Sequence, residues 1–244
     1  MNKNRRGSIF TSTLLAIIFG SNLIFAQTPA KPKPSPAKPQ ITETDIAEAK
    51  QVLSALGYWL DVQVQGRDAS LRHALIAFQK IEGRAKTGSL TLKELAAIRK
   101  AQPPQPLESK AAHIEVDLTR QVLFVVNDSG LIEGILPISS GSGEWFTEGG
   151  RTRQAITPTG RFKVTHQIKG WRKSPLGLLY YPNYIYDGIA IHGNPAVPTT
   201  PASHGCIRIP MFAAQAFSDL AKVGTEILIY GESPVPPRPK PATQ

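Results

Sequence analysis

The chain has 244 residues, a formal net charge of +10 and 41% hydrophobic residues, so at least part of it can bury an ordinary core. Its length suits one good-sized domain together with a smaller one. The positive charge does not argue for a nucleic-acid partner, because the sequence has no basic helix interleaved with aromatic residues and no nucleic-acid-binding motif. An anionic polymer or a membrane surface fits the excess charge better.

Residues 1–26 have the pattern of an export signal. Three basic residues, Lys3, Arg5 and Arg6, precede an uncharged apolar stretch at residues 9–25, and Ala26 is a small residue after which a signal peptidase could cut. The stretch is near the lower length limit for a membrane span, so an uncleaved membrane anchor is the alternative. We expect cleavage and an exported mature protein.

Proline-rich segments divide the rest of the chain. Residues 27–40 form a Pro/Lys-rich linker, residues 101–111 form a second Pro-rich linker, and residues 233–244 form a disordered Pro-rich tail. Between these segments we expect a small helical module at residues 41–100 and a larger domain at residues 112–232.

Three amphipathic patterns predict three helices in residues 41–100. Apolar residues recur at helical spacing in residues 46–56 and again in residues 71–78. Thr91 and Glu94 make a capping-box pattern that starts a third helix. A module this small has a thin core and gains from tight helix packing.

A fixed order of short motifs runs through the same module. The order is Leu-Gly-Tyr at residues 56–58, Leu71, Ala-Leu at residues 74–75, Ala-Phe-Gln at residues 77–79, and then Gly83 and Gly88. This order resembles the peptidoglycan-binding domain type 1 family, and the resemblance implies a module that binds the bacterial cell wall. The alternative is a helical spacer that binds nothing, because a fold alone does not carry a function.

Strand patterns predict a β-rich second domain. Residues 114–119 alternate between apolar and polar, which predicts a half-buried strand, and Asn-Asp-Ser-Gly at residues 127–130 is typical of a hairpin turn. Further strands are expected at residues 121–126, 131–138, 160–165, 178–181, 189–191 and 225–230, and one helix at residues 210–223. The predicted fold class is α+β multidomain: a small three-helix N-terminal module and a mostly-β, sandwich-like, mixed-sheet domain with one helix after Cys206.

Cys206 is the single cysteine of the chain, and two of its five histidines lie in the same segment. A thiol attacks acyl groups as the thiolate, and a nearby imidazole can take its proton. His192 ends an apolar strand and is therefore rigidly placed, whereas His204 is only two residues from Cys206. Gly205 permits a turn in which its own amide and that of Cys206 point together as an oxyanion hole. A helix starting at Pro210 would bring its positive end near the thiolate.

The sequence around these residues carries a longer pattern. It reads His192-Gly193 and then Ser203-His204-Gly205-Cys206-Ile207-Arg208, with Thr-Pro-Thr-Gly-Arg-Phe upstream at residues 157–162. The pattern resembles the L,D-transpeptidase (YkuD-type) catalytic domain family over residues 112–230. The resemblance implies that Cys206 is the acylated nucleophile and His192 the base. It also implies that His204 and Gly205 shape the oxyanion site and that Arg208 supports the loop or a substrate carboxylate. Gly193 and Ser203 complete the expected substrate-binding set.

These residues predict an L,D-transpeptidase that forms peptidoglycan cross-links through a Cys206 thioester and releases D-alanine from a stem tetrapeptide. The expected partners are donor and acceptor stem peptides, the expected location is the periplasm or the cell wall, and no metal or organic cofactor is expected. One alternative is an L,D-carboxypeptidase or other murein hydrolase with the same acyl-enzyme. Another is a non-catalytic wall-binding protein. Two further alternatives concern the residues around the thiol. Cys206 could be a buried structural cysteine. His192, His204 and Cys206 could instead form a zinc site.

Overall fold

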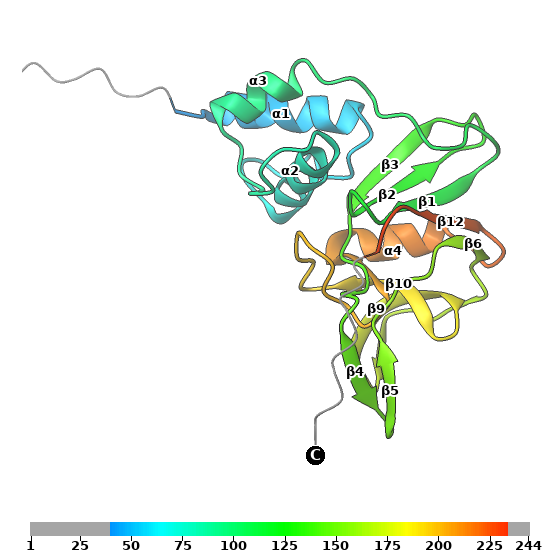
Figure 1. Cartoon of the computed structure of the whole chain (residues 1–244). Coiled ribbons are helices and arrows are strands. Elements are labelled where there is room, and N and C mark those ends of the chain that lie inside the picture. Colours follow the sequence, from blue (N-terminus) through cyan, green and yellow to red (C-terminus); the bar gives the residue numbers. More distant parts are fainter. Residues whose placement is uncertain (1–39, 234–244) are drawn as a thin grey trace, which may run out of the picture. The chain divides into compact units, whose positions relative to one another are not determined.

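The computed structural model describes residues 40–233, which are coloured by sequence in Figure 1. The predicted export signal, nearly all of the Pro/Lys-rich linker and the tail from residue 234 lie outside the described residues. Within residues 40–233, no helix combines the length and the apolar character needed to cross a membrane.

Three helices precede the first strand: α1 at Glu43–Ala55, α2 at Ala69–Ile81 and α3 at Leu92–Ile98. Each begins where a side chain accepts a hydrogen bond from a free backbone amide of the first turn, and these capping residues are Thr42, Asp68 and Thr91. At Thr42 the bond is reciprocated by Asp45, which completes a capping box.

Two sheets and a hairpin follow. The first sheet has the order β3-β2-β1-β12-β6, with β1 at His113–Asp117, β2 at Val122–Val126, β3 at Ile132–Pro137, β6 at Gly160–Lys163 and β12 at Glu226–Tyr230. The second has the order β11-β10-β9-β7, with β7 at His166–Gln167, β9 at Gly177–Tyr186, β10 at Ile189–Asn194 and β11 at Ile207–Pro210; β8 at Trp171–Ser174 pairs with β9. The hairpin consists of β4 at Trp145–Glu148 and β5 at Arg151–Gln154. The pairs β1–β12 and β10–β11 are parallel, so both sheets are mixed.

The main core lies between the two sheets. Ile114 and Val116 of β1 face inward with Ile227 of β12, and they share a cluster with Ile191 of β10 and Ile207 of β11. Helix α4, at Met211–Leu220, adds Ala213, Ala214 and Phe217 to the same cluster. The expected mostly-β, mixed-sheet domain with one helix after Cys206 is confirmed.

The opposite face of the first sheet is covered by the helices. Val122, Phe124 and Ile135 of that sheet share a second core with the buried residues of α1, α2 and α3. The backbone is also joined there, because Trp59 donates to the carbonyl of Ile135 at 3.1 Å and Ile135 donates to Gly57 at 2.8 Å. The helices therefore pack as a layer on the sheet. The division into a module at residues 41–100 and a domain at residues 112–232 stays a prediction.

The expectation that the first strand is half-buried was wrong. Glu115 and Asp117 are both buried, along with the apolar residues that alternate with them. The polar face is covered by the segment expected as a linker, where the amides of Leu107 and Glu108 each donate to the Glu115 carboxylate at 2.8 Å. His113 contacts the same carboxylate through Nε2 at 3.0 Å. Alternation in sequence marks two different faces, but a polar face is exposed only if no other segment packs on it.

Candidate active site

The thiol and the nearest imidazole come from two adjacent parallel strands. His192 of β10 pairs in register with Arg208 of β11, and Cys206 immediately precedes β11. Side chains alternate along a strand, so Cys206 and Arg208 project from the same face as His192. The intervening residues, Ile191 and Ile207, point into the core and hold both strands in place.

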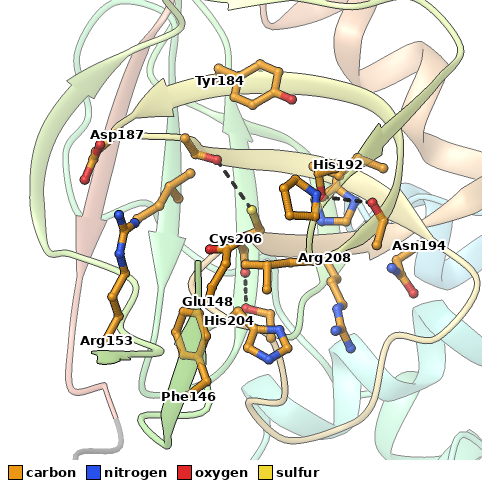
Figure 2. A pocket seen from close by; sticks show the side chains of 18 of the residues that line it. Phe146, Glu148, Arg153, Tyr184, Asp187, His192, Asn194, His204, Cys206 and Arg208 are labelled. Carbon is orange, nitrogen blue, oxygen red and sulfur yellow. Dashed lines mark hydrogen bonds between the residues drawn. The ribbon is translucent and has the colours of Figure 1, made fainter. Parts of the chain in front are cut away.

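This face forms the floor of a cleft of about 490 Å³. One wall is the β4–β5 hairpin, which contributes Phe146, Glu148 and Arg153, and the facing wall is the β8–β9 hairpin. Figure 2 shows the Cys206 sulfur in the middle of the cleft with His192 on one side and Asp187 and Arg153 on the other.

His192 is held as a neutral imidazole with one defined tautomer. It is 4% exposed, and its Nδ1 lies 2.9 Å from the carbonyl oxygen of Gly193. A carbonyl can only accept, so Nδ1 carries the proton and Nε2 keeps a free lone pair. Burial lowers the pKa of His192 to about 4, and the charge of Arg208 lowers it further, against the opposing effect of the Gly193 carbonyl. At neutral pH the ring is therefore unprotonated at Nε2, as a general base must be before the reaction.

Cys206 is half-buried, and its thiol lies 3.9 Å from the carbonyl oxygen of Gly188. Burial raises the pKa of this thiol, while a hydrogen bond from the Ala190 backbone and the positive charge of Arg208 lower it less. The resting state is thus a neutral thiol beside a neutral imidazole. Desolvation therefore opposes the formation of a thiolate–imidazolium ion pair.

The loop that carries Cys206 is fixed by two buried hydroxyl groups. Ser203 Oγ accepts from the amide of Gly205 at 3.0 Å and donates to the carbonyl of Cys206. Thr157 Oγ1 donates to the carbonyl of Gly205 at 2.7 Å and accepts from the amide of Gly141 at 2.9 Å. Gly205 has a φ of +128°, and a Cβ there would lie 3.0 Å from the carbonyl oxygen of Ile156. The Thr-Pro-Thr-Gly motif and the nucleophile loop are therefore one hydrogen-bonded unit.

The other predicted site residues have different positions. His204 is exposed, and its ring packs edge-on against Phe146 at a centroid distance of 4.7 Å, away from the sulfur (Figure 2). The Gly205 amide is already bonded to Ser203, so it does not point freely into the cleft. Gly193 is needed for packing, because a Cβ there would lie 2.6 Å from Cβ of Ala214 in α4.

The expected role of the helix dipole was wrong. Strand β11 separates Cys206 from α4, which begins only at Met211. Four extended residues span about 13 Å, whereas the effect of a helix terminus fades beyond its first turn. The nearby positive charge is instead that of Arg208, which takes part in none of the ion pairs found within residues 40–233.

Several residues that shape the site were not singled out from the sequence. Asp187 and Gly188 both have positive φ and make the tight β9–β10 turn beside the thiol. The Asp-Gly pair was a usable turn signal. The backbones of Ser139 and Ser140 form hydrogen bonds with the segment that carries Cys206. No local sequence pattern predicts this role. Within residues 40–233, no group of three or more His, Cys, Asp or Glu side chains is arranged to hold a metal ion.

Comparison with known proteins bears on this geometry. The L,D-transpeptidase catalytic domain family, YkuD, matches residues 111–229. A crystal structure of an L,D-transpeptidase from Xylanimonas cellulosilytica is 34% identical, with a TM-score of 0.73, and the match covers 81% of this chain and 100% of that one. This chain belongs to the L,D-transpeptidase family. The family model covers residues 111–229, which are less than half of the chain. Because the Xylanimonas structure matches 81% of the chain, that similarity extends beyond the catalytic domain.

More distant members of the family have also been solved. An L,D-transpeptidase from Stackebrandtia nassauensis is 20% identical with a TM-score of 0.48, and its match covers 85% of this chain and 100% of that one. One from Mycobacterium tuberculosis is 19% identical with a TM-score of 0.41, covering 50% of this chain and 58% of that one. No curated protein matches this chain.

Proposed function

We propose that this protein is an L,D-transpeptidase that cross-links peptidoglycan through a Cys206 acyl-enzyme. The observation that carries the proposal is the pairing of β10 with β11, which supports a thiol and an imidazole with a free Nε2 on one face of a cleft. A nucleophile and a base on rigid paired strands, open to a substrate-sized cleft, are the requirements for acyl transfer.

The first half-reaction forms a thioester. Cys206 Sγ attacks the carbonyl carbon of the third residue of a stem tetrapeptide as its proton passes to His192 Nε2. The tetrahedral intermediate collapses, the bond from that carbon to the nitrogen of the terminal D-alanine breaks, and His192 gives its proton to that nitrogen. D-Alanine leaves, and the tripeptide acyl group stays on sulfur.

The second half-reaction resolves the thioester. An amine from a neighbouring stem attacks the acyl carbon and gives its proton to His192, which passes it to the departing thiolate of Cys206. The products are one new amide bond and the free enzyme. Because the resting thiol is neutral, proton transfer to His192 accompanies the attack, and no thiolate has to exist beforehand.

Two groups are proposed to stabilise negative charge. The amide of Cys206 itself is the candidate oxyanion donor, since the Gly205 amide is bonded to Ser203. Arg208 is the candidate partner of a substrate carboxylate, because its guanidinium lines the cleft and forms no ion pair within residues 40–233.

The surroundings of the reaction are proposals as well. The signal-like residues 1–26 support export to the periplasm or the cell wall, where the peptide substrates are found. The motif order in residues 56–88 supports a contribution of the helices to wall binding. Sedimentation of the whole protein with purified sacculi, with and without substitutions on the helices, tests the second proposal.

The products of purified protein acting on a disaccharide-tetrapeptide test the reaction. We expect D-alanine release and cross-linked dimers from the wild type and neither from Cys206→Ala. Shortened monomers without dimers would identify an L,D-carboxypeptidase instead. Turnover by Cys206→Ala would overturn the thiol mechanism, and sacculus binding without any turnover would favour a wall-binding protein.

A further inference from the structure

Lys80 of helix α2 is a buried lysine whose ammonium group reaches the catalytic sheet. It is 4% exposed, and Nζ donates to the carbonyl of Gln121 at 2.9 Å and to the carbonyl of Ile138 at 2.7 Å. Burial lowers its pKa to about 7, so the site is an unfavourable place for a lysine. An apolar residue at this position would lack the two carbonyl contacts that Nζ makes.

Gln121, the first contact of Lys80, has a backbone that a non-glycine residue rarely adopts. Its φ is +57°, and its carbonyl accepts from both Lys80 Nζ and the Ile138 amide. Such left-handed residues persist where the surroundings over-determine them, and they cluster at functional sites. The Lys80 ammonium is one of the contacts that hold this carbonyl.

The side chain of Gln121 makes two hydrogen bonds with Ser140. Its Nε2 donates to Ser140 Oγ at 2.7 Å, and its Oε1 accepts from the Ser140 amide at 2.9 Å. The second hydrogen of Nε2 goes to the carbonyl of Leu118 at 2.8 Å, so both donor hydrogens of the amide are used. Ser140 is completely buried and has little freedom to move.

Ser140 in turn holds the loop that carries the nucleophile. Its carbonyl accepts from the amides of Ala202 and Ser203, each at 2.9 Å. Ser203 then bonds through Oγ to the Gly205 amide and the Cys206 carbonyl. An unbroken path of buried hydrogen bonds therefore runs from Lys80 through Gln121, Ser140 and Ser203 to Cys206.

We propose that Lys80 is a positioning residue for the nucleophile: it fixes the backbone of Gln121 and, through Gln121 and Ser140, the loop of Cys206. The helical layer is then part of the catalytic apparatus and not only a possible binding module. This inference needs the proposed function only for its turnover measurement, because the position of the loop can be measured without substrate.

Amide hydrogen exchange of the full chain carrying Lys80→Met provides the test. The substitution keeps the apolar stem and removes the donor, so two buried carbonyls each lose a contact. We expect faster exchange in the peptide spanning residues 198–210 but not in β12. We also expect kcat on the tetrapeptide to fall about tenfold with KM nearly unchanged, because small displacements of a nucleophile are costly.

Lys50→Met is the matched control. Lys50 is also buried, and its Nζ likewise donates to two carbonyls, those of Asp61 and Val64, besides an ion pair with Asp68. None of these partners bonds to the nucleophile loop. We expect Lys50→Met to speed exchange in residues 61–70 and to leave residues 198–210 as in the wild type.

Ser140→Ala serves as a second variant, since it keeps Lys80 but removes Oγ, the acceptor of one of the two hydrogen bonds by which the Gln121 side chain holds Ser140. Faster exchange of residues 198–210 in Ser140→Ala and Lys80→Met, but not in Lys50→Met, supports the proposal. Unchanged exchange there in Lys80→Met, or an equal rise in Lys50→Met, overturns it. If Lys80→Met does not fold, Ser140→Ala decides. Faster amide exchange confined to residues 198–210 in that variant supports the proposed path, and unchanged exchange there overturns it. Wild-type protein without turnover would refute the proposed function, while the exchange result would still decide the role of Lys80.

Discussion

The buried lysines of the helical layer and the basic residues of the cleft on the second sheet differ in how they are bonded. Under the helices, Lys50 Nζ has three oxygen partners and Lys80 Nζ has two. In the cleft, His192 uses Nδ1 alone, and Arg208 forms no ion pair within residues 40–233. The bonded lysines hold the fold, while His192 and Arg208 keep unused bonding capacity in a cleft where a substrate can reach it. The buried Nδ1 of His73 also lacks a partner, but His73 lies on α2 and does not line the cleft.

The largest effect is expected from removing the free lone pair on the cleft side. In His192→Gln the amide can still donate to Gly193, but the basic nitrogen is lost, so kcat/KM should fall about 10²–10⁴-fold. Steady-state kinetics on the disaccharide-tetrapeptide measures this loss.

His73→Gln is the control for that loss. His73 lies on α2, and burial also lowers its pKa to about 4, so it matches His192 in electrostatics but not in position. We expect its kcat/KM to stay within about twofold of the wild type, as for most substitutions away from a site. Equal losses of kcat/KM in the two variants would mean that the position of His192 in the cleft does not matter for catalysis.

The protonation state of Cys206 gives the next largest effect. Because burial raises the pKa of the thiol, the thiolate fraction at neutral pH is small and grows with pH. Alkylation of the free enzyme by iodoacetamide should therefore accelerate about tenfold per pH unit from pH 6 to pH 9, since the thiolate is the nucleophile. A rate independent of pH between 5 and 8 would reveal a preformed thiolate–imidazolium pair and would contradict the neutral resting state.

A smaller effect is expected at Thr157, whose hydroxyl joins the motif at residues 157–160 to the nucleophile loop. Thr157→Val keeps the shape of the side chain but leaves the Gly205 carbonyl and the Gly141 amide without this partner. The free energy of unfolding should fall by about 1–3 kcal/mol for each group left unpaired. Urea denaturation measures the change.

Thr147→Val is the matched control, because Thr147 is exposed on β4 and its hydroxyl has one hydrogen-bond partner within residues 40–233, the hydroxyl of Thr152. Its stability should change by no more than about 0.5 kcal/mol. If Thr157→Val proves equally mild, the hydroxyl is not what joins the motif at residues 157–160 to the nucleophile loop.

The nucleophile segment was readable from the sequence because its chemistry is local. Cys206, His204 and Arg208 lie within five positions of one another, and His192 follows an apolar run that predicts a strand. The roles of these residues were harder to infer. We expected the N-terminus of the helix to lie near Cys206, but β11 separates them. The sequence Ile-Arg-Ile-Pro did not predict this strand, because it is short and ends in proline, which is rare inside strands.

Contacts between segments that are distant in the sequence could not be predicted from local sequence patterns. Nothing near Glu115 indicates that residues 107–108 would cover it, and nothing near Lys80 indicates Gln121. The β4–β5 hairpin was also missed, since β4 is only partly buried, β5 is mostly exposed, and both lack an apolar alternation. Gly149 and Gly150, both with positive φ, were the one available turn signal.

The most direct test of the central claim is intact-protein mass spectrometry after brief incubation with the disaccharide-tetrapeptide, followed by mapping of the modified peptide. We expect an adduct equal to the substrate minus D-alanine, carried by the peptide that contains Cys206 and absent from Cys206→Ser. We expect this adduct to accumulate more slowly in His192→Gln. An adduct on any other residue, or D-alanine release by Cys206→Ser, would contradict a mechanism in which Cys206 is the nucleophile.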